Sequence, residues 1–140
     1  MENIYLECHK KLMELSRKII DKSKCNISKQ GFAWNQFKVM KSINPGESLT
    51  LSQISERASK KNSNITQIID YLEERGIVRR RPDDRDRRVI RVELTKEGEK
   101  IREQVIKYHE EFVQSMYHSL TDSEIKSFLE LAEVFLERIK

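Results

Sequence analysis

The residues from Arg75 to Arg91 carry the most concentrated chemistry in this sequence, because eight arginines stand there with three aspartates and no lysine. Their formal charge is 8 − 3 = +5 against +4 for the whole chain, so the remaining residues sum to 4 − 5 = −1. The planar guanidinium of arginine can bind phosphate or a base edge through two parallel hydrogen bonds. One short cationic segment in an otherwise slightly acidic chain therefore indicates an anionic partner.

A β-hairpin is the element that this arginine segment predicts. Apolar side chains alternate with their neighbours from Val89 to Leu94, and Pro82-Asp83-Asp84 is typical of a tight turn. We expect two strands, over Ile77 to Arg81 and over Arg87 to Leu94. Successive side chains of a strand point to opposite faces of the sheet, so the arginines are divided between two faces. This division predicts unequal roles for them.

Two short helices precede this hairpin. Thr50-Leu51-Ser52-Gln53 has the spacing of a capping box, which predicts a helix start. After the polar turn Ser59-Lys60-Lys61, Asn62 or Ser63 can cap a second helix, and Gly76 ends it. Two helices joined in this way are typical of a helix-turn-helix, and the hairpin behind them would be a wing.

The second of these helices carries polar residues at its N-terminal end, the end of a recognition helix that contacts bases in the major groove. Amide and hydroxyl groups there can pair with base edges, although capping and solvent exposure are the ordinary alternative for any one residue. The acidic residues between positions 70 and 74 stand at the far end, where they repel phosphate least.

The wing is expected to reach phosphates or an adjacent minor groove, whose negative potential attracts arginine. Asp86 would weaken that attraction unless it holds a neighbouring arginine, so we assign it an orienting role and assign contact to Arg88 or Arg87. Arg79 to Arg81 and Arg85 would add backbone attraction without sequence information. The predicted DNA-binding residues are Asn62, Ser63, Asn64, Thr66, Gln67, Arg79, Arg81, Arg85, Asp86, Arg87 and Arg88.

Amphipathic helices are expected on both sides of this module. Residues 3 to 24 place apolar side chains on one stripe, a loop is expected from Asn26 to Gly31, and a helix from Ala33 to Ser42. Thr95 can cap a helix after the hairpin, and Thr121 to Glu124 forms a capping box before the last helix. The predicted fold is mainly α, a winged helix-turn-helix with a two-stranded wing and N- and C-terminal dimerisation helices.

The terminal helices carry more apolar surface than the small middle module can cover, which predicts packing on each other and on a second copy of the chain. We expect a single domain over residues 1–140, with dimerisation helices in 1–30 and 99–140 and the DNA-binding module in 31–98. The residues expected at the dimer interface are Ile4, Cys8, Leu12, Ile125, Phe128, Leu129, Ala132, Phe135 and Leu136.

Composition argues against several other classes. The apolar runs are too short to span a membrane, and Glu2 and Glu7 stand where a signal peptide would be apolar, which favours a cytoplasmic protein. The sequence shows no nucleophile and base set, phosphate loop or metal-ligand spacing, so we expect no enzyme, metal site or cofactor. The three histidines are expected at the surface or an interface.

Two cysteines and three aromatic residues leave further functions open. Cys8 lies on the apolar stripe of the first helix, where a buried thiol is usually inert. A disulfide with Cys25 along one helix is excluded, because helical rise puts them roughly 25 Å apart, while a bridge between two copies stays possible. Phe32, Trp34 and Phe37 could line a pocket for a small aromatic effector or belong to the core.

From Ser63 to Gly98 the sequence resembles the recognition-helix-to-wing segment of the MarR family, the multiple antibiotic resistance regulators. The residues that carry the resemblance are Ser63-Asn64-Ile65-Thr66, Ile69-Asp70, Leu72-Glu73, Gly76, Asp86-Arg87-Arg88, Val92-Glu93-Leu94-Thr95 and Gly98. The turn Ser59 to Asn62 departs from the family pattern, because it adds positive charge and lacks a glycine or apolar residue. The resemblance implies a homodimer that binds a pseudo-palindromic operator, usually represses, and is released by ligands or oxidation. Because the family includes peroxide sensors with a cysteine near the N-terminus, the resemblance also makes Cys8 the candidate redox residue.

These features predict a sequence-specific DNA-binding transcriptional regulator, a homodimeric repressor released by a small-molecule or oxidative signal. Its predicted partners are double-stranded DNA, a second copy and a small aromatic effector, with no membrane. The alternative is a winged helix that serves as an architectural or protein-interaction module without operator specificity, because a fold alone does not determine function.

Overall fold

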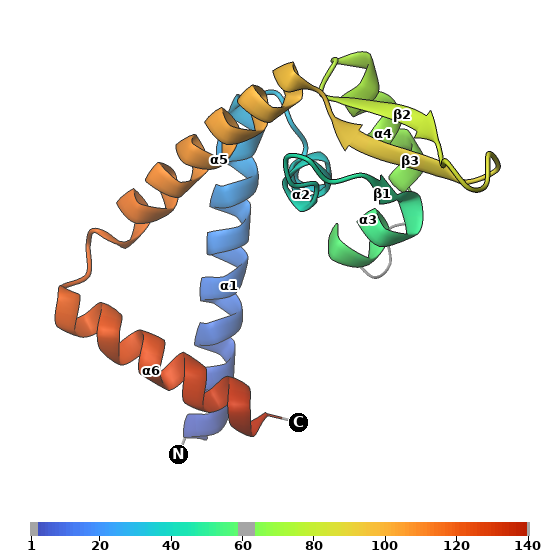
Figure 1. The fold of residues 1–140 in the computed structure, drawn as a ribbon. Helices are drawn as coiled ribbons and strands as arrows, with labels where there is room; N and C mark the ends of the chain where they lie inside the picture. The colour runs from blue at the N-terminus through green and yellow to red at the C-terminus, as the bar shows by residue number, and fades with distance from the viewer. Residues whose placement is uncertain (1–2, 59–63, 140) are drawn as a thin grey trace. The chain divides into compact units, whose positions relative to one another are not determined.

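The computed structural model describes residues 3–58 and 64–139, which form helices and one small antiparallel sheet (Figure 1). The predicted order of helices and hairpin is confirmed, and so is the mainly helical winged-helix fold. None of the helices in the described part is long and apolar enough to cross a membrane. The elements in chain order are α1 (Ile4–Lys29), α2 (Trp34–Ser42), β1 (Leu49–Thr50), α3 (Leu51–Ala58), α4 (Ile65–Glu74), β2 (Val78–Pro82), β3 (Ile90–Leu94), α5 (Lys96–Tyr117) and α6 (Asp122–Arg138).

The first helix is longer than its sequence pattern predicts. α1 continues to Lys29, so the loop expected from Asn26 is wrong. Asn26 and Ile27 are both buried, and their packing favours helical backbone where the apolar stripe had ended. Gly31 follows with a φ of 90°, a left-handed conformation that glycine adopts without steric cost and that is common after a helix end.

Three strands form the sheet in the order β1-β3-β2, and both neighbouring pairs are antiparallel. β2 and β3 are the predicted hairpin, in which Arg80 lies opposite Val92 and Arg81 opposite Arg91. Sequence patterns do not predict β1, because its two residues are too few to show an alternating period.

The second strand of the hairpin is shorter than predicted. β3 begins at Ile90, so the expected strand start at Arg87 is wrong, and Arg87 to Val89 belong to the tip. The backbone N–H of Asp83 donates to the carbonyl of Val89, and the N–H of Val89 donates to the carbonyl of Asp86, both at 2.9 Å. Turn hydrogen bonds therefore replace ladder pairing at the tip.

The hydrophobic core centres on the sheet and helices α2, α3 and α4, and it includes Ile27 of α1 and Val105 of α5. Ile54, Ile69, Leu72 and Val92 are fully buried there. Gly98 lets α5 begin close to this core, because an added Cβ would lie 1.9 Å from the carbonyl oxygen of Ile77. The core thus holds the two short helices and the base of the hairpin in one body.

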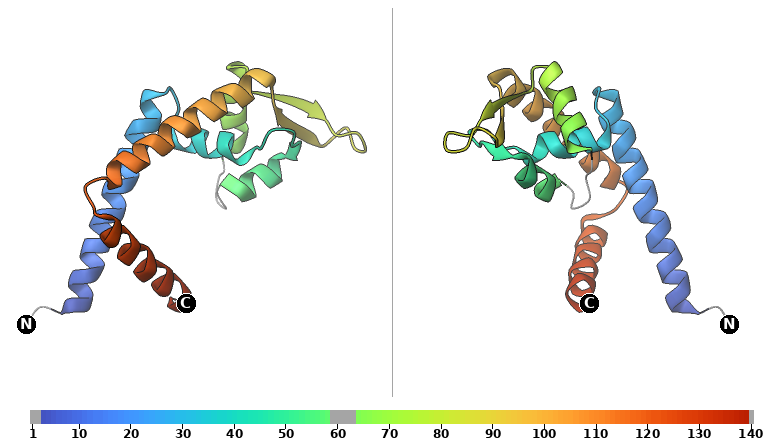
Figure 2. Two further views of the ribbon diagram at one scale, coloured as in Figure 1. Left: turned by 60° about the vertical axis from the view of Figure 1, so that its left-hand side comes forward. Right: turned by 90° about the vertical axis from the view of Figure 1, so that its right-hand side faces the viewer.

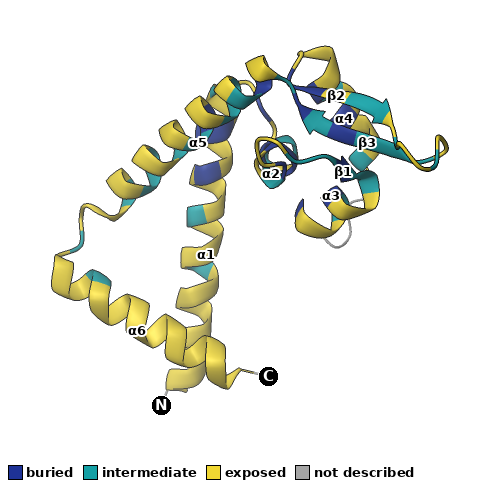
Figure 3. Ribbon diagram, in the orientation of Figure 1, coloured by how far each residue is buried: buried dark blue, intermediate teal, exposed yellow. Residues whose placement is uncertain are grey.

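The chain divides into two compact units, residues 1–109 and 110–140, with the boundary inside α5. In the first unit the hairpin of β2 and β3 extends beyond the helices in every view (Figures 1 and 2). Buried residues gather from α2 to β3, whereas most of α1 is exposed and α6 contains no buried residue (Figure 3). The single domain over residues 1–140 remains a prediction.

Candidate nucleic-acid interface

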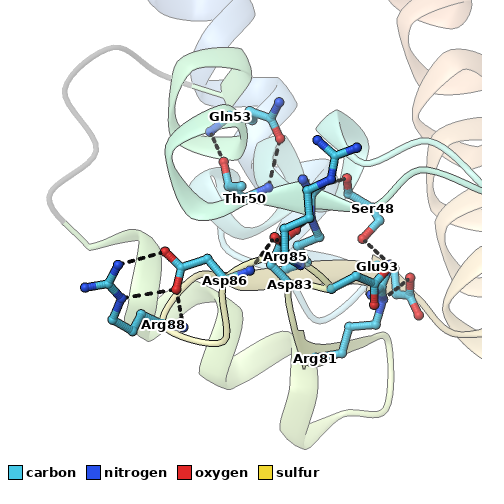
Figure 4. A network of polar contacts seen from close by, with 11 residues as sticks. Ser48, Thr50, Gln53, Arg81, Asp83, Arg85, Asp86, Arg88 and Glu93 are labelled. Carbon is cyan, nitrogen blue, oxygen red and sulfur yellow. Dashed lines mark hydrogen bonds and ion pairs between the residues drawn. The ribbon is translucent and has the colours of Figure 1, made fainter.

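Helices α3 and α4 are the two short helices that the sequence predicts ahead of the hairpin. The N–H of Thr50 donates to Oε1 of Gln53 at 2.9 Å, and the N–H of Gln53 donates to Oγ1 of Thr50 at 3.3 Å (Figure 4). This reciprocal pair is the predicted capping box, and it satisfies two backbone donors at the start of α3. α3 contacts α4, so the pair forms the two-helix body of a helix-turn-helix.

Helix α4 buries an apolar face and exposes polar side chains near its N-terminal end. Ile68 and Ile69 are buried, whereas Thr66 and Gln67 are exposed. The exposed amide and hydroxyl are of the kind that pairs with base edges. The start of the helix therefore has the character that the sequence predicts.

The residue that caps α4 differs from the prediction. The N-cap is Asn64, which is exposed and precedes the first helical residue, Ile65. The cap had been predicted at Asn62 or Ser63, and both of these lie outside the described residues.

Arg80 joins the wing to α4. Its Nη2 lies 2.5 Å from Oδ1 of Asp70 and its Nη1 lies 2.8 Å from Oε1 of Glu73. Its backbone N–H also donates to the Glu73 carboxylate at 3.1 Å, and Nη2 donates to the carbonyl of Thr66 at 3.3 Å. Burial alone would lower the pKa of Arg80, but the hydrogen bonds to Asp70 and Glu73 raise it. These acids hold the guanidinium against α4 and pair its charge. The geometry therefore does not favour the phosphate contact that the sequence predicts for Arg80.

Glu93 holds two further arginines of the hairpin. Nε of Arg79 lies 2.6 Å from Oε1 of Glu93, and Nε of Arg81 lies 3.2 Å from Oε2. The hydrogen bond from Arg79 is the main reason that the pKa of Glu93 is lowered. Arg81 also donates to Oγ of Ser48 at 3.2 Å, which ties the hairpin to the segment before β1.

Asp83 organises the tip of the wing, a role that the sequence reasoning missed. Its Oδ2 accepts the backbone N–H groups of Arg85 and Asp86, each at 3.1 Å, and its Oδ1 accepts Nε of Arg91. The hydrogen bond from Arg91 is the largest cause of the lowered pKa of Asp83. An aspartate just before its backbone partners in a turn is an Asx-turn pattern, and that signal in Pro82-Asp83-Asp84 could have found it.

Asp86 holds Arg88, as the sequence predicts. Nε of Arg88 lies 3.1 Å from Oδ1 of Asp86 and Nη2 lies 3.2 Å from Oδ2, while the backbone N–H of Arg88 donates to Oδ1 at 3.0 Å (Figure 4). These hydrogen bonds lower the pKa of Asp86, with the Arg88 side chain as the largest cause. The Arg88 side chain is still 90% exposed, so Asp86 orients it without removing it from solvent.

Two arginines at the tip complete this surface. Arg85 and Arg87 are exposed, and their side chains form no ion pair with any described residue. Together with Arg88 they present guanidinium groups on the turn between β2 and β3. We call Arg85, Arg87 and Arg88 the wing tip arginines.

The other predicted sites have varied surroundings. Cys8 and Cys25 are exposed free thiols. Cys8 is therefore not buried within the single chain, although it lies on an apolar stripe. Phe32 and Phe37 are buried in the core, while Trp34 is partly buried and packs against Phe37. The described residues contain no group of three or more histidine, cysteine or acidic side chains placed to hold a metal ion.

Comparison with known proteins agrees with this geometry. A sequence model of the MarR family matches residues 32–90. The HTH-type transcriptional repressor MdtR of Bacillus subtilis is 32% identical over 114 residues, which are 81% of this chain and 74% of MdtR. The chain belongs to the MarR family. Another relative, the regulator YsmB of Bacillus subtilis, is 36% identical over 80 residues, but the match spans only 57% of this chain and 55% of YsmB.

A solved structure extends the similarity to nearly the whole chain. A MarR variant from Escherichia coli, crystallised with operator DNA, is 25% identical and has a TM-score of 0.73 over 96% of this chain and 99% of its own. This protein is therefore a winged helix-turn-helix transcriptional regulator of the MarR family. Helices α3 and α4 are its helix-turn-helix, and β2 and β3 are its wing.

Proposed function

We propose that this MarR-family regulator is a homodimeric repressor that binds a pseudo-palindromic operator, with α4 in the major groove and the wing tip arginines at the flanking minor groove. The observation that carries the proposal is the exposed polar start of α4 on the same body as a cationic tip whose Arg88 is aimed by Asp86. The operator DNA in the Escherichia coli MarR crystal supports it. Enzymatic activity is not part of the proposal.

The contacts are divided between reading and anchoring. Thr66 and Gln67 are exposed near the start of α4 and would pair with base edges, together with the predicted residues Asn62, Ser63 and Asn64. The wing tip arginines would bind phosphates or enter the minor groove, whose negative potential favours them. Arg79 and Arg81 keep part of their surface exposed beside Glu93 and would add general attraction.

A homodimer would cover apolar side chains that are exposed in the single chain. Ile4 is 71% and Leu136 is 72% exposed, and the other predicted interface residues on α1 and α6 are exposed or only partly buried. A dimer would also present two α4 helices, and half-sites one helical turn apart would need them about 34 Å apart.

Truncation before Ile125 would remove the predicted interface residues of α6. The shortened chain should therefore be unstable, or be monomeric when its mass is measured by sedimentation. A stable dimer of the truncated chain would contradict this interface.

A signal would release the DNA by altering this dimer. A hollow of about 350 Å³ is lined by Lys24, Ser28, Phe32, Ala33, Trp34 and Asn35, and it could admit part of a small aromatic effector. The alternative signal is oxidation of Cys8, whose thiol is exposed. If peroxide weakens operator binding equally in the wild type and in Cys8→Ser, oxidation of Cys8 is not the signal.

A regulator that binds operator DNA must be in the same compartment as that DNA, so we also propose a cytoplasmic location.

Selection of DNA from a random pool, followed by competition, tests the proposed function. The wild-type protein should enrich an inverted repeat and retain it against excess random DNA. Gln67→Ala should change the base preference at one position of each half-site, whereas Arg87→Ala should weaken binding to all sequences similarly. A protein that binds the pool with a steep salt dependence but without any preferred site would instead be an architectural module.

A further inference from the structure

Arg75 belongs to the arginine-rich segment but its side chain lies away from the wing. It is the C-cap of α4, and its Nη1 donates to the carbonyl oxygen of Gly31 at 2.7 Å. The Tyr71 hydroxyl donates to the same carbonyl at 2.7 Å, and Nη1 of Arg75 also donates to that hydroxyl at 2.7 Å. Three groups from α4 and the α1–α2 junction thus form one closed set of hydrogen bonds.

Aromatic packing holds the same guanidinium in place. The Cζ atom of Arg75 lies 4.5 Å from the ring centroid of Phe32 and 5.5 Å from that of Tyr71. The two rings meet edge to face with centroids 6.4 Å apart. A guanidinium over an aromatic face is attracted by the ring quadrupole, so both rings reinforce the hydrogen bonds.

The backbone at the junction is shaped to admit this side chain. Gly31 has a φ of 90°, and an added Cβ would lie 3.2 Å from Nη1 of Arg75. The Gly31 carbonyl comes directly after the C-terminal end of α1, where carbonyl groups lack helical partners and a cation is favourable. Arg75 therefore caps the end of α4 and also contacts the junction that follows α1.

We propose that Arg75 is a positioning residue for operator recognition, which fixes the C-terminal end of α4 to the α1–α2 junction and so sets the angle at which Thr66 and Gln67 meet DNA. The proposal rests on the proposed operator binding. With its 10 residues α4 spans about 15 Å, so a tilt at Arg75 moves the opposite, base-reading end. The same contacts of Arg75 and Tyr71 with Gly31 would transmit any displacement of the C-terminal end of α1 to α4.

Arg75→Met tests this role against the matched variant Arg87→Met, which removes the same charge from the wing tip. Arg75→Met should weaken operator binding about 5- to 10-fold, while affinity for random DNA and the slope of log affinity against log salt stay unchanged. Arg87→Met should lower that slope by about 0.9 and weaken binding to both DNAs. An equal loss of slope in Arg75→Met would show a phosphate contact, and unchanged operator affinity would remove the role altogether.

A second measurement is independent of DNA. Amide hydrogen exchange of residues 71–76 in the free protein should accelerate in Arg75→Met and in the milder Tyr71→Phe, and should not change in Arg87→Met. The two substitutions combined should cost operator affinity less than the product of their separate fold-losses, because both break one set of hydrogen bonds. Unchanged exchange rates of residues 71–76 would contradict the positioning role of Arg75. A wild-type protein that binds no preferred DNA site would contradict the proposed function alone.

Discussion

The strands of the wing and its tip share one residue type but place it in different surroundings. On the strands, acidic side chains hold each arginine: Arg80 pairs with Asp70 and Glu73, and Arg79 and Arg81 pair with Glu93. At the tip, Arg85 and Arg87 form no ion pair with a described residue, and Arg88 is paired yet 90% exposed. The difference indicates that the strand arginines build the wing, while the tip arginines are available to DNA.

Removal of Arg88 should give the largest change in binding. Arg88→Ala should weaken operator binding by about 1–3 kcal/mol, because a contact with DNA and its preset orientation are lost together. The free energy of unfolding should change by less than about 0.5 kcal/mol, since the side chain is exposed. Fluorescence anisotropy and denaturant unfolding measure the two quantities. Unchanged operator affinity in a folded dimer would reject the functional role of the tip.

Removal of Arg80 should act mainly on stability. Arg80→Ala should lower the free energy of unfolding by about 1–2 kcal/mol, because Asp70 and Glu73 lose a partner that is only 23% exposed. Arg85→Ala is the matched control and should cost less than about 0.5 kcal/mol. Equal losses in urea unfolding would erase the distinction between strands and tip.

Substitution of Asp86 should affect specific and nonspecific binding in opposite directions. Asp86→Ala should weaken operator binding, because Arg88 is no longer held in one orientation. Binding to random DNA should strengthen slightly, since a negative charge leaves the tip. Competitive binding with operator and random duplexes separates the two. Tighter binding to both would show that Asp86 only repels DNA.

Low pH should lower the free energy of unfolding, because it protonates carboxylates of the wing. The pKa of Asp83 is lowered in the folded protein, chiefly by Arg91, so the unfolded chain takes up a proton at higher pH than the folded chain. The stabilisation is complete above the unfolded value of about 3.9 and is lost as pH falls through the lower folded pKa. Unfolding free energies from pH 7 to pH 3 should decline less in Asp83→Asn, and parallel declines would contradict this.

Local sequence signals predicted much of the fold. The capping boxes at Thr50 and Thr121 and the alternation in β3 depend on neighbouring residues, so they were readable without tertiary contacts. The pairing of Asp86 with Arg88 was predictable for the same reason, since the two residues are two positions apart. The end of α1 at Lys29 and the strand β1 were not, because each depends on packing with distant residues.

The sequence by itself determined that one cationic hairpin follows a helix-turn-helix, because charge, capping and period are carried by the chain. The tertiary structure alone decided what each arginine contacts. Arg75 and Arg80 look alike in the sequence, yet one contacts the carbonyl of Gly31 and the other contacts two acids of α4. A side chain's partners depend on the elements brought beside it, and those elements come from positions that no local pattern connects.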